Sequence, residues 1–148
     1  MKDAVILKNK AIIFGWVIGL LFFISLLWVL SQPLQKYYLL RTINNVLISS
    51  GDSRRIAEYK GVNDGKAGIF GYWFLMDNSA EKMFVFAAFQ DGILVPLGAI
   101  VSANGSVDDI IPLSAHAMQI AGNLPMSLLQ VYITRIEAAS LANIRGNK

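Results

Sequence analysis

The sequence predicts an α+β protein: one N-terminal transmembrane helix, then a small domain with an antiparallel sheet of about four strands and a long C-terminal helix. Three observations lead to this prediction. An uncharged apolar run lies near the N-terminus, short apolar runs separated by turn residues follow it, and apolar residues recur at helical spacing near the C-terminus. With 148 residues, 55% hydrophobic and 16% charged, the chain has room for one modest domain and is too apolar to be intrinsically disordered.

The uncharged run reads AIIFGWVIGLLFFISLLWVL. As an α-helix it is about 30 Å long, which matches the hydrocarbon thickness of a bilayer. Trp16 and Trp28 lie toward its ends, where aromatic side chains anchor a helix at the membrane–water boundary. We therefore expect a transmembrane helix over residues 11–31, retained as a signal-anchor. A cleaved signal peptide is the alternative, with Val29 and Ser31 as its small cleavage-site residues.

Charge predicts the orientation of this helix. The basic tail of residues 1–10 carries three lysines and one aspartate, whereas residues 32–148 carry ten bases and nine acids. The positive-inside rule favours a cytoplasmic N-terminus, so we expect residues 32–148 to form an extracytoplasmic, periplasmic domain at the cell membrane. Because this domain is nearly neutral, it is not expected to bind nucleic acid.

Gly15 and Gly19 are spaced as GxxxG within the apolar run. Two glycines on one face allow two membrane helices to approach closely. They are candidate helix-pairing residues, although glycine is also common in membrane helices without such a role.

A second, juxtamembrane helix is expected after the span. Apolar residues recur at helical spacing over residues 34–48, Pro33 suits a first turn and Gly51 a stop. Residues 51–68 are rich in turn formers and predict a loop or ragged hairpin. Their GVNDGKAG segment lacks the spacing of a phosphate-binding loop.

Four apolar runs then predict the sheet. Asp91-Gly92 is a strong hairpin dipeptide, because both residues tolerate positive φ. Pro96 cannot donate to a strand ladder, so we expect a kink or a sheet edge there. The expected strands cover residues 69–76, 83–89, 93–102 and 107–111.

Two helices are expected after the sheet. Residues 113–122 predict a short helix or turn that ends near Gly122. Beyond Pro125, apolar residues at helical spacing over residues 126–145 predict a longer amphipathic helix that covers one face of the sheet.

Few residues suit catalysis. The chain has no cysteine and one histidine, which excludes thiolate chemistry and any two-histidine metal site. His116 and Ser114 could form part of a hydrolase site, but no third residue can be named for it. A cluster of aromatic residues around Trp73 predicts a packed core, and Trp73 becomes a candidate interaction residue if it is exposed.

The stretch ANGSVDDIIPLSAH, residues 103–116, resembles a hairpin of the small FMN-binding domains in membrane-anchored subunits of redox complexes. The resemblance extends over residues 91–144. It implies a related α+β fold and, as an alternative function, noncovalent binding of FMN near Gly105 and His116. The flavin-attachment motif of covalent members is missing, because Asn123 to Ser127 read NLPMS in place of Ser-Gly-Ala-Thr.

The leading functional expectation is a noncatalytic single-pass membrane subunit or scaffold. Its partners would be the lipid bilayer together with other subunits of a membrane complex or a second copy of the chain, and it would need no cofactor. The alternative is the flavin-binding redox subunit.

Overall fold

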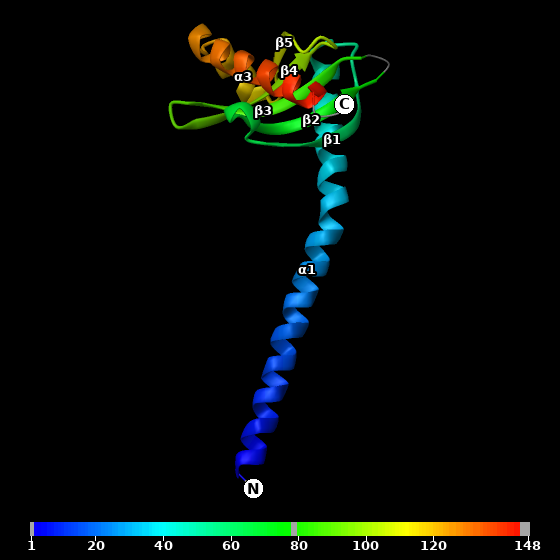
Figure 1. The fold of residues 1–148 in the computed structure, drawn as a ribbon, viewed down its shortest axis with the longest axis vertical. Coiled ribbons are helices and arrows are strands. Elements are labelled where there is room, and N and C mark those ends of the chain that lie inside the picture. Colours follow the sequence, from blue (N-terminus) through cyan, green and yellow to red (C-terminus); the bar gives the residue numbers. More distant parts are fainter. Residues whose placement is uncertain (1, 78–79, 146–148) are drawn as a thin grey trace. The chain divides into compact units, whose positions relative to one another are not determined.

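The computed structural model describes residues 2–77 and 80–145, and it shows an α+β fold (Figure 1). The chain divides into two units, Met1–Leu39 and Leu40–Lys148. The elements are α1 (Lys2–Ser49), β1 (Ile56–Asp64), the 3-10 turn η1 (Lys66–Gly68), β2 (Phe70–Met76), β3 (Lys82–Gln90), β4 (Ile93–Val101), β5 (Val107–Pro112), α2 (Ala115–Ala121) and α3 (Met126–Arg145).

The two helices expected before the sheet are one continuous helix, α1, with Pro33 inside it. The expectation of a helix start at Pro33 was therefore wrong. Pro33 removes only the one hydrogen bond that its amide would have donated to the Val29 carbonyl, and the helix continues on both sides of it. At its other end α1 stops as expected: Gly51 has φ 77°, and the amide of Asp52 donates to the Leu47 carbonyl at 2.9 Å.

The sheet has five antiparallel strands in the order β1-β2-β3-β4-β5, one more than expected. The extra strand is β1, which lies where a loop or ragged hairpin was predicted. The reason is visible in its register with β2, which shifts between Ile56 and Glu58 and again between Tyr59 and Gly61. These bulges break the alternation of apolar and polar residues by which a strand is found in a sequence.

The β3–β4 hairpin follows the prediction at its tip. Gln90 pairs with Ile93, and Asp91 and Gly92 have φ values of 49° and 81°. The expectation of a sheet edge at Pro96 was wrong, because β4 pairs with both β3 and β5. Proline is tolerated there since its carbonyl accepts from the Leu113 amide at 3.0 Å just beyond the last β4–β5 pair, where no ladder donor is needed.

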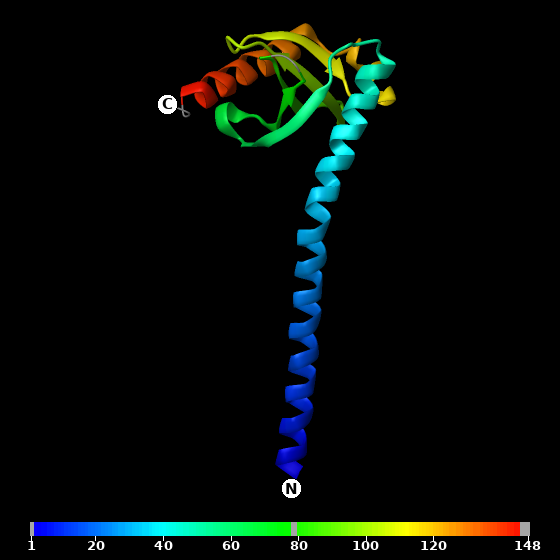
Figure 2. The same cartoon turned by 90° about the vertical axis from the view of Figure 1, so that its right-hand side faces the viewer.

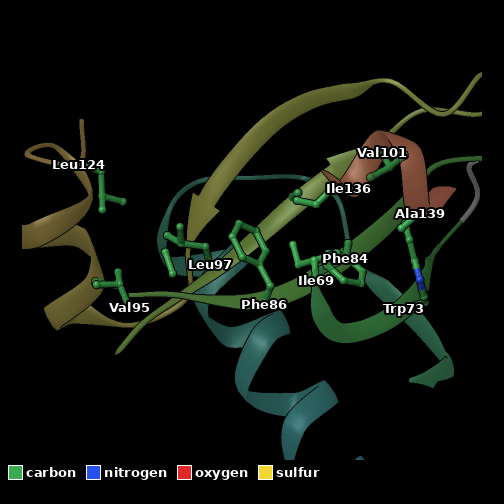
Figure 3. Close-up of a cluster of buried hydrophobic side chains, with 13 residues drawn as sticks. Ile69, Trp73, Phe84, Phe86, Val95, Leu97, Val101, Leu124, Ile136 and Ala139 are labelled. Carbon is green, nitrogen blue, oxygen red and sulfur yellow. The ribbon is translucent and has the colours of Figure 1, made fainter. Parts of the chain in front are cut away.

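The helix α3 lies over one face of the sheet (Figures 1 and 2), and the main core lies between that face and α3. Phe84, Phe86 and Leu97 from the strands pack with Ile136 and Ala139 of α3, and all five are at most 4% exposed (Figure 3). The long C-terminal helix and its role as a cover for one sheet face are thus confirmed.

The opposite face is partly covered by the last turns of α1, from Leu40 on, which lie on the other side of the sheet from α3 (Figure 3). Ile43 and Leu47 of these turns are buried. The Asn44 amide group donates to the Ile56 carbonyl at 3.0 Å and accepts from the Ile56 amide at 2.7 Å. This pair of hydrogen bonds fixes the end of α1 to the start of β1.

Candidate functional site

Trp73 is buried in the core. Its side chain is 4% exposed, and its ring lies 4.6 Å from that of Phe84 between centroids, in the core beneath α3 (Figure 3). The condition under which Trp73 was a candidate interaction residue is therefore not met. Tyr72 and Phe74, its neighbours in β2, lie on the opposite face as expected from strand alternation.

Gly15 and Gly19 lie on one face of α1 and leave a shallow, open hollow. A Cβ built on either glycine meets no atom within 4 Å. The hollow measures about 550 Å³ and is lined by Gly15, Trp16, Gly19, Leu20 and Phe23. Among the residues that the structure describes, none apart from the glycine's own neighbours in the helix lies within 4 Å of a Cβ built on either glycine.

The candidate cofactor residues do not lie together. Gly105 lies in the turn between β4 and β5, close to Ser140 of α3, whereas His116 is an exposed residue of α2, beyond the other end of β5. Ser114 caps α2, since its hydroxyl oxygen accepts from the Ala117 amide at 2.9 Å. Flavin binding stays a prediction, and absorbance of the purified protein in the flavin bands tests it.

One charged cluster joins the end of α1 to β5. The Arg54 guanidinium donates to the Asp52 carboxylate at 2.7 Å and lies 3.5 Å from the Asp109 carboxylate. Hydrogen bonding from Arg54 lowers the pKa of Asp52 below the usual carboxyl value, and the same contact raises the pKa of Arg54. Because each charge already has a partner inside the cluster, its evident role is structural. Among the described side chains, those of residues 13–77 and 80–142, no three from His, Asp or Glu gather in a way that could hold a metal ion.

The most unusual surface is on the sheet face that α1 covers only in part. Tyr72 pairs with Val62 of β1 and with Val85 of β3, so all three side chains lie on this face. The buried Phe74, two residues further along β2, lies on the same face. Nearer the hairpin tip, Phe89 of β3 pairs with Leu94 of β4. Beyond the part that the last turns of α1, from Leu40 on, cover, the face is apolar and exposed. We call this part the open apolar surface; it consists of Val62, Phe70, Tyr72, Ala87, Phe89 and Leu94.

The exposure of these side chains is large. Phe70 is 73% exposed, Leu94 65% and Phe89 59%. Tyr59 marks the border with the covered half: its ring contacts both Tyr72 and Phe74, and burial raises the pKa of its phenol. Adjacent exposed apolar residues of this size mark a binding surface more often than isolated ones do.

Sequence reasoning missed the open apolar surface, because it assigned the aromatic residues to a core as one group. The signal that could have found it is the number of aromatic residues on the face opposite Trp73. Phe70, Tyr72 and Phe74 alternate along β2, and a single crossing helix can cover only part of such a row.

The fold defines the class of this protein, which is an α+β protein with an apolar helix near its N-terminus. By length and composition, the segment Ile13–Ser49 of this helix is sufficient to cross a membrane. Comparison of the chain with protein-family models, with curated proteins and with solved structures found no match.

Proposed function

We propose that this chain is a single-pass membrane protein that acts as a noncatalytic subunit or scaffold of a larger membrane complex. The observation that carries the proposal is the exposure of the apolar part of α1. From Ile13 to Leu30 every residue is exposed, including Phe14, Trp16 and Phe22 at 67–77%. Leaving so many large apolar side chains in water is unfavourable, at about 25 cal/mol per Å², and a bilayer removes this cost.

Assembly with a protein partner is supported by the hollow over Gly15 and Gly19. In lipid, helix pairing depends on close packing of backbones, and the hollow permits such an approach by a neighbouring helix. The neighbour is another subunit of the complex or a second copy of this chain.

The same proposal places the domain outside the cytoplasm. The support is the lysine excess in residues 1–10, which favours retention of the N-terminus in the cytoplasm. Labelling of intact cells with a membrane-impermeant maleimide tests this orientation on a Val131→Cys variant, since the chain has no other cysteine. Labelling supports an extracytoplasmic domain, and protection until the cells are lysed contradicts it.

The assembly is tested by purifying the tagged full chain from native membranes in a mild detergent. We expect a stoichiometric partner or a defined homo-oligomer, measured by light scattering with correction for the detergent. A Gly15→Leu, Gly19→Leu double variant should lose the partner. The matched control is Val17→Leu, which adds bulk about 160° away around the same helix. A wild-type chain that is purified as a monomer without a partner would contradict the proposal.

A further inference from the structure

We propose that the open apolar surface and the tip of the β3–β4 hairpin bind the interfacial region of the phospholipid bilayer in which the chain is anchored. This inference rests on the proposed function, because it requires α1 to hold the domain at a membrane. It assigns a lipid contact to the domain in addition to the lipid contact of the helix.

The hairpin tip is the first support. Phe89 and Leu94 face one another on one side of the hairpin, and Ile93, 43% exposed, lies on the other side. A flat protein partner on the open apolar surface would leave Ile93 in water. Insertion of the tip into the headgroup–acyl boundary removes apolar side chains on both sides of the hairpin from water.

The shortness of the tether is the second support. Residues 31–39 connect the apolar span to the unit that begins at Leu40, and they are helical. Nine helical residues extend about 14 Å, and even fully extended they would reach only about 30 Å. The domain of every copy is thus held near the bilayer, whereas a second protein has to be encountered at its own concentration.

The chemistry of the surface is the third support. Its members are Phe, Leu, Val, Ala and Tyr, without a charged side chain, and Tyr72 can keep its hydroxyl at the polar boundary while its ring is buried. The nearby charges on β1, on η1 and at the hairpin tip leave a surplus of one negative charge; they are Glu58, Lys60, Asp64, Lys66 and Asp91. Apolar burial, and not attraction to anionic headgroups, is therefore expected to drive the contact, so a zwitterionic bilayer should be sufficient.

The experiment uses the full chain in phosphatidylcholine nanodiscs, with an environment-sensitive fluorophore on one introduced cysteine. Because the native chain has no cysteine, each label is unique. Phe89→Cys and Leu94→Cys report on the surface, and both native side chains are exposed, so the fold should tolerate the change. Val131→Cys, at an exposed apolar position of α3, is the matched control, and Ile24→Cys reports on the span.

We expect lipids carrying a spin label to quench the fluorophore at positions 89 and 94, and iodide to quench it several-fold less there than at 131. Strong iodide quenching at 89 and 94 would show that the surface faces water. Protection from both quenchers would show that protein covers it. Either result overturns the inference. If position 24 is also not quenched by the lipids, the proposed membrane anchor fails; if only positions 89 and 94 escape lipid quenching, the inference alone fails.

Discussion

Gly71 shows how closely the strands and their side chains fit. A Cβ at this position would lie 2.5 Å from both the Phe84 ring and the Val85 carbonyl oxygen. The ring could move only within a packed core, and the carbonyl belongs to the neighbouring strand. Gly71 is thus required by space, and its position inside the strand expected over residues 69–76 is typical of a glycine at a close backbone approach.

We expect Gly71→Ala to lower the free energy of unfolding of the domain by about 2–3 kcal/mol, which is typical of overpacking against atoms that cannot relax freely. Gly122→Ala is the control: its Cβ would meet no atom within 4 Å and its φ is −65°. That change should be neutral or raise stability by up to about 1 kcal/mol. Denaturant unfolding in mild detergent measures both, and equal effects of the two changes would contradict a close approach of β3 to Gly71.

Asp52 carries a pH prediction. Since Arg54 lowers its pKa in the folded state below the ordinary value of 3.8, ionised Asp52 stabilises the fold above the ordinary carboxyl range. This contribution is lost as the pH falls through the lowered pKa. Asp52→Asn should therefore be less stable than wild type at neutral pH, and the difference should shrink in acid.

Unfolding free energies at several pH values test this, with Asp77→Asn as a control that removes one exposed carboxylate. A difference between wild type and Asp52→Asn that stays constant from neutral to strongly acidic pH would mean that the Asp52–Arg54 contact does not stabilise the fold.

At the scale of elements, the end of α1 is a structural part of the domain. Ile43 and Leu47 are buried within it, and Asn44 satisfies both backbone groups of Ile56. The last turns of α1, from Leu40 on, therefore fold as part of the sheet domain.

Asn44→Ala is expected to cost about 1–3 kcal/mol of domain stability, because it leaves the amide and carbonyl of Ile56 without these partners. Asn45→Ala is the matched control, since Asn45 is exposed on the same helix and the change in helix propensity is the same. Similar unfolding free energies for the two variants would contradict a fixed attachment of α1 to β1.

The elements that could be predicted from the sequence are those with a strong local signal. The apolar helix, the Asp91-Gly92 hairpin and the C-terminal helix each follow from composition, turn chemistry or spacing within one segment. β1 could not be predicted, because its two bulges interrupt the strand pattern. The continuity of α1 through Pro33 was also not evident, since proline at that position is typical of a helix start.

At the scale of the whole molecule, the candidate site was harder to predict than the fold. The open apolar surface exists because α3 covers one face of the sheet and the last turns of α1 cover only part of the other. Which aromatic residues become core and which stay exposed depends on how far each helix extends over the sheet. That is a tertiary property, and no single segment of the sequence contains it.

Both proposals depend on the insertion of the apolar part of α1 into a bilayer. The most direct measurement is extraction of native membranes with alkaline carbonate, followed by flotation on a density gradient. We expect the full chain to stay with the floating membranes, as an integral protein does. Release of the chain into the soluble fraction would contradict the account, because a domain bound to the membrane only at its surface would be stripped by this treatment.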